Sequence, residues 1–323
     1  MTMSKSVKVI CIGAAVQDVF LMGKIFKAQR EKDDYVQEFE LGTKNEVEDI
    51  VMSTGGGATN AAVTFARADF HACYMGQIGE DLSGKAVLSD LHKDGVDTSL
   101  VKFTDKFGTG YSTILLAPNG ERTILTYRGA SKNYEIHESD FHDVHADWFY
   151  VSSLSGNTDA LKAIISYAKA HDIKVAINPG GGELMHIRQF KDLLSSFSIL
   201  SLNKEEMQEL FSGKKPEDIL RKAAEHVPVV LLTDGPNGSY ATDGAHIFKA
   251  GMYEDVPVVD RAGAGDAFSS GFVAQIARGE SMEHALTYAS ANSTSVVSKV
   301  GAKAGILNEN AKLHAMPIQV SNL

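Results

Sequence analysis

The chain has few residues of the kinds that mark secreted or membrane proteins. Among its 323 residues there are two cysteines, Cys11 and Cys73, one tryptophan and seven prolines. Both cysteines lie in apolar runs typical of strands, so we expect no disulfide framework and a reducing compartment. No apolar run reaches the length of about 18 residues that a membrane-spanning helix needs. Residues 1–7 contain no apolar segment of signal-peptide length, so we expect a cytoplasmic protein without a membrane partner.

Positive charge is also scarce. The sequence has 31 Lys and Arg residues against 41 Asp and Glu residues, which gives a formal net charge of −10. Nucleic acids and anionic membranes attract basic surfaces, so we expect neither as a partner. With 44% hydrophobic residues, the chain is long enough for one large domain with a smaller appendage.

Short apolar runs alternate with amphipathic segments after about residue 148. Strands are predicted at residues 7–15, 148–153, 174–178, 199–203 and 229–233, and helices at 157–171, 204–211 and 216–226. This alternation predicts an α/β fold in which helices cover both faces of a mostly parallel sheet. Ligands bind at the carboxyl ends of such strands. The polar residues predicted at those ends are Asp18, Asn178, Asn203, Asp234 and Asp260.

Two segments do not follow this alternation. Residues 31–48 are charged with interspersed apolar residues, which suggests an exposed sheet, and residues 110–127 predict a hairpin with its turn at Pro118-Asn119-Gly120. We group them as a small β-sheet lid, from about 20–50 and 108–130, on a single domain that spans residues 1–323. A lid of this kind excludes water from a site.

The most informative stretch reads D-R-A-G-A-G-D-A-F over residues 260–268. A short apolar run at 256–259 precedes it, and Phe268 begins an apolar repeat at every fourth residue, which predicts a strand, a tight turn and a helix. Gly263 and Gly265 allow a sharp turn and a close approach to a ligand. The unpaired N–H groups of the first helical turn, together with the helix dipole, favour a bound anion such as phosphate.

Asp266 lies within this anion-binding turn, where its carboxylate would repel a phosphate. Its presence is explained if it faces the hydroxyl group that attacks the phosphate. The helix dipole favours the ionised carboxylate, so such a base does not require a raised pKa. The alternative is that Asp266 is a first-turn capping acid and that the glycines only form the turn.

Three further motifs allow two interpretations each. Gly55-Gly56-Gly57 with Asn60 precedes a helical run, and is either a ligand-binding turn or a flexible loop that Asn60 caps. Asn203 and Glu206 fit a capping box, or Glu206 lies near a hydrated Mg²⁺ ion at the phosphates. Residues 233–239 form a turn or line a nucleotide.

Three resemblances to other motifs are rejected. Residues 79–85 match most of a P-loop, but Ala86 replaces the hydroxyl residue that binds Mg²⁺. His137-Glu138 resembles a zinc protease motif, but Phe141 stands where the second ligand belongs. No G-x-G-x-x-G sequence follows a strand, so a dinucleotide oxidoreductase has little support.

Taken together, these motifs resemble the PfkB carbohydrate kinase family, also called the ribokinase family. Residues 55–68 resemble its N-terminal signature, 260–272 its C-terminal signature, and 203–206 its N-x-x-E motif. Residues 13–18 have the spacing of its first strand and its substrate-binding Asp. The resemblance spans residue 7 to about residue 305, with the motifs in the expected order.

The resemblance implies a Rossmann-like sheet with a β lid, and a role for each motif. Asp266 would be the catalytic base, and the amides of Gly263, Ala264 and Gly265 the anion hole. The substrate would bind Asp18, Gly56, Gly57 and Asn60. The residues implied at ATP are Asn203, Glu206, Thr233, Gly235, Gly238 and, less directly, Asn292. Glu206 would act on Mg²⁺ through water. A monovalent cation such as K⁺ would lie at Asp260, Ala262 and Gly301.

The substrate is predicted only as a class. The family implies an ATP-dependent kinase of a small sugar, but Gly55-Gly56-Gly57-Ala58 lacks the lysine that ribokinases carry there. Arg128 would bind an acidic or phosphorylated sugar if it points inward, and residues 178–183 could touch substrate or phosphate. The rivals are a nucleoside kinase, whose base could stack on Phe20, Tyr35 or Tyr111, and a catalytically silent sugar-binding regulator. We also expect a homodimer through the lid.

Overall fold

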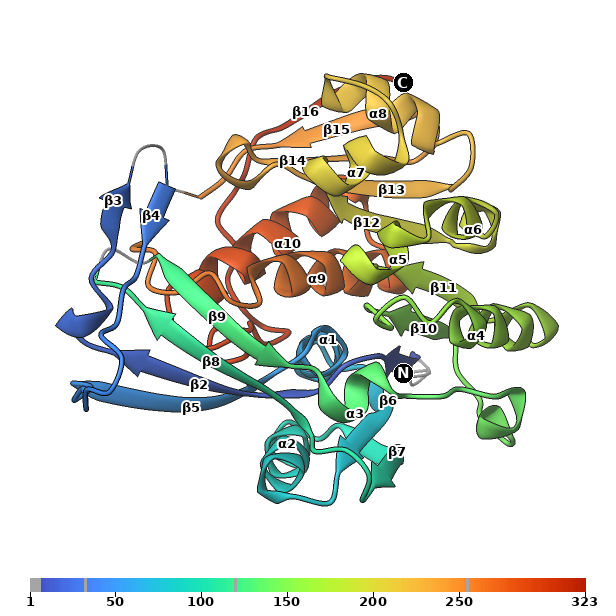
Figure 1. The fold of residues 1–323 in the computed structure, drawn as a ribbon. Coiled ribbons are helices and arrows are strands. Elements are labelled where there is room, and N and C mark those ends of the chain that lie inside the picture. Colours follow the sequence, from blue (N-terminus) through green and yellow to red (C-terminus); the bar gives the residue numbers. More distant parts are fainter. Residues whose placement is uncertain (1–6, 32–33, 119–120, 254–255) are drawn as a thin grey trace.

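A mostly parallel sheet forms the centre of the computed structural model, which describes residues 7–31, 34–118, 121–253 and 256–323 (Figure 1). Seven neighbouring strands of this sheet run parallel, and three further strands at one edge are antiparallel. In spatial order the strands are β16 (Ile318–Asn322), β15 (His246–Ala250), β14 (Ser239–Thr242), β13 (Val229–Thr233), β12 (Ile199–Asn203), β11 (Lys174–Ile177), β10 (Trp148–Val151), β1 (Lys8–Ile12), β6 (His71–Gly79) and β7 (Asp97–Thr104).

Helices cover both faces of this sheet, which confirms the predicted α/β fold. One face packs against α1 (Gly57–Arg67), α2 (Leu82–Lys93), α9 (Ala264–Arg278) and α10 (Met282–Val297). The other packs against α4 (Thr158–Ala170), α5 (Gly181–Met185), α6 (Ile187–Lys191), α7 (Lys204–Leu210) and α8 (Pro216–Ala223). Alternate side chains of β1 enter the two cores, so the strand is apolar throughout. The short elements α3 (Gly129–Lys132), η1 (Lys24–Phe26), η2 (Glu138–Phe141), η3 (Leu194–Ser196) and η4 (Gly235–Asn237) connect these layers.

The direction of winding reverses between β1 and β10. From β1 the parallel strands continue through β6 to β7, and from β10 they continue through β11 and β12 to β13. The connections that leave the carboxyl ends of β1 and β10 therefore diverge and open a crevice, which is where open α/β sheets bind ligands. Gly13 follows β1 and Ser152 follows β10, so both residues lie at this point.

A second, four-stranded sheet projects from one side of the body (Figure 1). Its order is β5 (Asp49–Gly55), β2 (Val16–Met22), β8 (Gly110–Leu116) and β9 (Arg122–Tyr127). Strands β8 and β9 form the predicted hairpin, although Asn119 and Gly120 of its turn lie outside the described residues. Asp18 lies opposite Ser53 and Ser112 in the register, so these three side chains share one face.

The prediction of a sheet at residues 31–48 is largely wrong. The short strands β3 (Gln29–Glu31) and β4 (Asp34–Val36) pair with each other, and residues 37–48 form no strand. The lid strands lie on either side of this segment, in β2 and β5. Charge is frequent in residues 31–48 because the segment connects two strands at the surface, and its apolar residues Phe39 and Leu41 are exposed.

The strand predicted at residues 256–259 is also absent. The amide groups of Val259 and Asp260 bond to the carbonyl oxygen of Val297 in α10 instead of to a neighbouring strand. Pro257 has no N–H group to donate to a ladder. Asp260 therefore does not follow a sheet strand. Asp18 does not either, because the predicted strand 7–15 ends at Ile12 and the chain enters the lid.

Candidate active site

The turn before α9 holds the motif of residues 260–268. Gly263 is the N-cap with φ 75°, a left-handed conformation that favours glycine. A Cβ atom there would lie 2.5 Å from that of Ala302, so a larger residue would also clash. Nothing lies within 4 Å of a Cβ built on Gly265, which leaves open space at the start of the helix. The first-turn amides of α9 face this space and can bind an anion.

Asp266, in the first turn of α9, accepts a hydrogen bond from Asn60 of α1. The distance from Asn60 Nδ2 to Asp266 Oδ2 is 2.8 Å, which joins the two motifs across 206 residues of sequence. The Asn60 carbonyl oxygen Oδ1 is buried and has no partner among the described residues. The protein around Asp266 displaces water and raises its pKa, while the Asn60 hydrogen bond and the charge of Lys303 lower it. The helix dipole therefore does not give this carboxyl group a low pKa.

Asp18 enters the same pocket from the lid. Burial raises its pKa to about 6, a hydrogen bond from Ser112 and the charge of Lys303 lower it, and repulsion by Asp260 and Asp266 raises it further. A Cβ atom on Gly55 would lie 2.1 Å from Asp18 Oδ2, so only glycine leaves room for this carboxylate. Asp18, Gly57 and Asn60, which the sequence predicts at the substrate, therefore converge.

Gly57 and Ser152 complete the floor of this pocket. A Cβ atom on Gly57 would lie 3.0 Å from Ser152 Oγ and 3.3 Å from Asp266 Oδ1. The Ser152 hydroxyl group is buried and has no partner among the described residues. Ser152 was not identified from the sequence, although it stands near the carboxyl end of the strand predicted at residues 148–153, where ligands bind. Gly56, with φ 99°, turns the chain into α1 at this point.

A cavity of about 560 Å³ lies at the start of α9. Its volume is in the range of small-molecule sites. Ala264 and Gly265 line it, as do Thr233, Gly235 and Gly238. Pro236, from the same segment 233–239, lines it as well. The lining residues not identified from the sequence are Gly251, Met252, Tyr253, Val256, Val258, Arg261, Phe268, Ser290, Ser293, Thr294 and Val297. The apolar run at 256–259 thus contributes to a cavity wall, which explains its composition better than a strand does.

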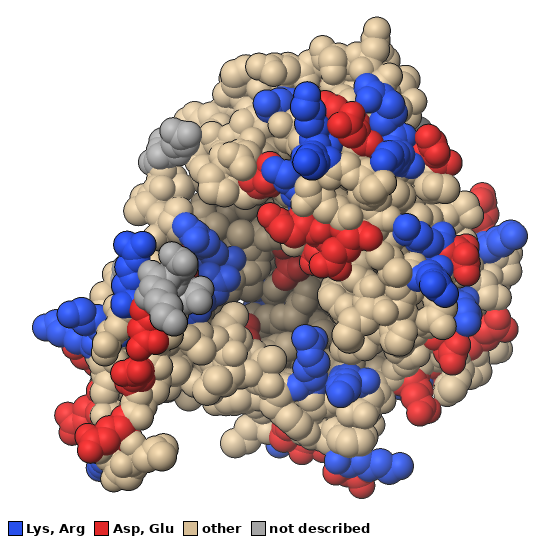
Figure 2. Space-filling model, turned by 45° about the horizontal axis from the view of Figure 1, so that its top comes forward, with Lys and Arg blue, Asp and Glu red and all other residues tan. Residues whose placement is uncertain are grey.

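Figure 2 shows this face of the molecule hollowed between the lid, on the left, and the α/β body. Acidic side chains gather on the body side of the hollow, and basic ones lie on the lid side and below it. The cleft is therefore open between the two parts that contribute Asp18 and Asp266.

Asn203 and Glu206 form the capping box of α7. The Glu206 amide donates to Asn203 Oδ1 at 2.9 Å, and the Asn203 amide donates to Glu206 Oε2 at 3.1 Å. Burial raises the pKa of Glu206, and repulsion by Glu209 and Glu205 adds to the effect. Only one carboxylate oxygen of Glu206 takes part in the cap, so the other can accept a hydrogen bond from a water molecule. The capping and the ligand-binding interpretations are compatible.

Asp260, Ala262 and Gly301 are held together by hydrogen bonds. The Asp260 carboxylate accepts from the amide groups of Ala262 and Gly301, each at 3.0 Å, and Asp260 itself is buried. These bonds fix the loop before α9 to the loop after α10. Backbone carbonyl groups of two loops held in this way fit a hard cation, which takes oxygen ligands.

Asn292 and Glu183, which the sequence places at possible ligand contacts, form hydrogen bonds within the fold instead. Asn292 is fully buried and bonds to the backbone of Ala267 and Leu307, away from the cavity. Arg128 directly follows β9 and is exposed. Glu183 is buried and accepts four hydrogen bonds, from the Ser153 hydroxyl group and the amides of Leu154, Gly156 and Gly180. Glu183 therefore binds its own loops.

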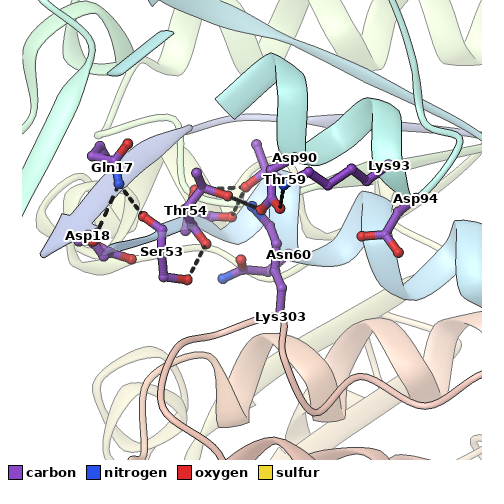
Figure 3. Close-up of polar contacts among 12 residues, drawn as sticks. Gln17, Asp18, Ser53, Thr54, Thr59, Asn60, Asp90, Lys93, Asp94 and Lys303 are labelled. Carbon is purple, nitrogen blue, oxygen red and sulfur yellow. Dashed lines mark hydrogen bonds and ion pairs between the residues drawn. The ribbon is translucent and has the colours of Figure 1, made fainter. Parts of the chain in front are cut away.

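Lys303 was not found from the sequence, because it stands in a loop without a motif. Its side chain is buried and donates to Thr54 at the end of lid strand β5 (Figure 3). Burial lowers the pKa of Lys303 to about 8, while the charges of Asp90, Asp18 and Asp94 raise it. Lys303 is thus a cation near the two site carboxylates.

The fold and the site define a class of phosphotransferase, and comparison with known proteins identifies the family. The model of the pfkB family carbohydrate kinases matches residues 9–309, so the chain belongs to this family. It is an ATP-dependent kinase of the sugar and nucleoside class, which confirms the class predicted from the sequence.

Individual relatives agree with this membership. The chain is 27% identical to the ribokinase of Staphylococcus aureus (strain COL), over 93% of this chain and 96% of that protein. It is 29% identical to the ATP-dependent ribose-1-phosphate kinase of Halopiger xanaduensis, over 78% of this chain and 83% of that protein. The structure of a ribokinase from Cryptococcus neoformans var. grubii in complex with ADP matches with a TM-score of 0.74 at 23% identity, over 95% and 98% of the two chains. This likeness establishes the fold.

Among the described residues, none of the helices combines the length and the apolar character that crossing a bilayer requires.

Proposed function

We propose that the protein transfers the γ-phosphoryl group of ATP to a hydroxyl group of a small sugar, with Asp266 as the base. One observation carries the proposal. Ala264 and Gly265 line a ligand-sized cavity, and the next residue, Asp266, faces a polar pocket that contains Asn60. ATP in the cavity and the sugar hydroxyl group in the pocket would meet at one helical turn, which supplies both the amide groups and the carboxylate.

The chemistry of this turn suits phosphoryl transfer, which depends on positioning and on charge stabilisation. The amides of Gly263, Ala264 and Gly265 would stabilise the charge on the transferred group. Asp266 would orient the attacking hydroxyl group and accept its proton. Asn60 holds Asp266 through one oxygen atom, which leaves the other for the acceptor.

The acceptor pocket supports a sugar more than a nucleoside. Asp18, the free carbonyl oxygen of Asn60 and the Ser152 hydroxyl group can bind several hydroxyl groups. The three aromatic residues considered for base stacking do not offer a platform there. Phe20 is fully buried, Tyr35 lies outside the lid sheet, and Tyr111 lies opposite Gln17 and so on the lid face away from Asp18.

Mg²⁺ would be held near Glu206 through water, where it would neutralise phosphate charge. The free oxygen of Glu206 and the open space above Gly265 support this position. A monovalent cation such as K⁺ would lie at the carbonyl groups of the loops that Asp260 ties together, near Ala262 and Gly301.

The test is ADP release from ATP and Mg²⁺ with pentoses, hexoses, sugar acids, sugar phosphates and nucleosides. We expect one sugar to respond, and Asp266→Asn to lower its turnover by about 10²–10⁴-fold with ATP binding retained. Asp159→Asn is the matched control, since Asp159 is a 94% exposed side chain on α4. Full turnover in Asp266→Asn would show that Asp266 is not the base. ATP binding without turnover on any compound would favour the silent regulator.

The lid sheet would close over the acceptor pocket as a subdomain of a single kinase domain, and would also form a homodimer. Its face away from Asp18 carries exposed apolar side chains, at Ile50, Met52, Leu125 and Tyr127. A bare apolar sheet face of this kind marks an interaction site, and a second copy supplies a matching surface. Two buried free cysteines suit a cytoplasmic location, which subcellular fractionation would test.

A further inference from the structure

Lys303 is held from its backbone by helix α1. The guanidinium group of Arg67 donates to the carbonyl oxygens of Lys303 and Ile306 at 2.9 and 3.0 Å. The same group pairs with both carboxylate oxygens of Asp94, the C-cap residue of α2, at 2.7 and 3.1 Å. The loop that carries Lys303 is therefore fixed to the body independently of the lysine side chain.

The side chain of Lys303 joins that loop to two other elements (Figure 3). Its Nζ atom donates to Thr54 Oγ1 of β5 at 2.7 Å and lies 3.8 Å from Asp90 Oδ2 of α2. The Thr54 hydroxyl group donates to that same oxygen of Asp90. Lys303, Thr54 and Asp90 thus form a closed triad between the C-terminal loop, the lid and the body.

The triad lies where the lid strand enters the acceptor pocket. Thr54 is between Ser53, which lies opposite Asp18 in the register, and Gly55, which packs against the Asp18 carboxylate. A Cβ atom on Gly301 would lie 2.7 Å from Ser53 Oγ, so the loop and the strand are in close contact here as well. A displacement of β5 at Thr54 would therefore change the space around Asp18.

A buried ammonium group is costly, and an apolar side chain of similar volume often stabilises a protein as well or better. The distinctive contribution of a paired, buried lysine is a fixed geometry between the elements that it joins. Its charge acts on four carboxylates or is acted on by them, namely Asp90 of α2, the C-cap residue Asp94, Asp18 of β2 and Asp266 of α9. Its charge is thus balanced in this one arrangement.

We propose that Lys303 is a positioning residue for the acceptor. It fixes the C-terminal end of lid strand β5 to α2 and so sets the position of Asp18. The inference rests on the proposed function, since it assigns Asp18 to the acceptor. Lys303 acts through Thr54, and its ammonium group is directed to Thr54 and Asp90.

The kinetic test compares Lys303→Met, Thr54→Val and their double variant with the wild type. We expect each single variant to raise the acceptor KM about tenfold or more while the KM for ATP stays within about twofold. The double variant should be no worse than Lys303→Met, because both changes break one connection. Lys93→Met is the matched control, since Lys93 lies 4.0 Å from the other oxygen of Asp90 but is 72% exposed. Thr54→Val keeps the buried charge and guards against a folding defect in Lys303→Met.

Hydrogen–deuterium exchange tests the same inference without an acceptor. The amide groups of residues 49–55 should exchange faster in Lys303→Met and in Thr54→Val than in the wild type and in Lys93→Met. Unchanged exchange in β5, or equal effects on the KM of acceptor and ATP, would overturn the role of Lys303. If no acceptor is found but exchange rises as expected, the connection stands and the proposed function fails.

Discussion

Two carboxyl groups at the cleft are held in surroundings that oppose their ionisation. Burial raises the pKa of Asp18 to about 6, and loss of water raises the pKa of Asp266. Lys303 counteracts both effects, and Asn60 adds a hydrogen bond to Asp266. A base whose pKa lies closer to neutrality accepts a proton more readily, so the raised pKa of Asp266 suits its proposed role better than a strongly acidic group would.

The same shift makes Asp18 a source of instability above pH 6. Its folded-state pKa of about 6 exceeds the ordinary value of 3.8, so the folded state binds the proton more tightly and loses stability as the pH rises between these values. Asp18→Asn should therefore increase the free energy of unfolding by roughly 2–3 kcal/mol at pH 8, and by less at pH 5. Urea denaturation at the two pH values measures this. An equal gain at both would contradict the assigned shift.

Loops after neighbouring strands are joined by single carboxylate side chains. Glu183, in the first turn of α5, is the acceptor for the loop after β10 and for the start of its own helix. Asp81 does the same elsewhere, since it caps α2 through the Gly84 amide and accepts from the amide and hydroxyl groups of Thr109 beside the lid. The P-loop-like residues 79–85 are explained by this role.

Glu183→Gln should destabilise the protein by about 3 kcal/mol, because one acceptor oxygen is lost and a donor is placed against backbone N–H groups. Thermal unfolding measures the effect. Glu205→Gln is the control, since Glu205 is an exposed residue on α7. A melting temperature that falls equally in both variants would show that the hydrogen bonds of Glu183 contribute no more to stability than an exposed glutamate does.

The molecule as a whole consists of a helix-covered sheet and a separate small sheet. Helices cover only part of the outer face of this small sheet, which is the face directed away from Asp18. Helix α2 packs against the root of β2 and β5, and the tip of the outer face keeps its apolar side chains exposed. Exposure of apolar surface to water costs free energy, and association with a second copy would remove this cost.

Met52→Glu together with Leu125→Glu should convert a dimer to a monomer, because the charges would be buried against their own copies. Light scattering across a range of concentrations measures the mass. Met185→Glu, at a 79% exposed position on α5 outside the lid sheet, is the control for added charge. A wild-type protein that is monomeric at all concentrations would rule out the proposed dimer.

The sequence by itself determined the fold class, the strands from β10 to β13 and the helices α4, α7 and α8, because apolar strands alternate with amphipathic helices there. It did not predict the short helices α5 and α6. It also predicted Asp266 and Asn60 as site residues from the glycine-rich turns before their helices, and the two side chains are joined by a hydrogen bond. It failed at residues 31–48 and 256–259, where composition reflected surface exposure and a cavity wall rather than strand pairing.

Only the tertiary structure decided which residues share the pocket. The lid brings Asp18 to Asp266, β10 adds Ser152, and the C-terminal loop brings Lys303 to Thr54 across 249 residues. The ribokinase-type lysine is missing from the glycine-rich turn, yet a buried cation still lies beside it. No local pattern encodes such a contact, because it depends on how separate elements pack, and a lone lysine in a loop resembles any exposed one.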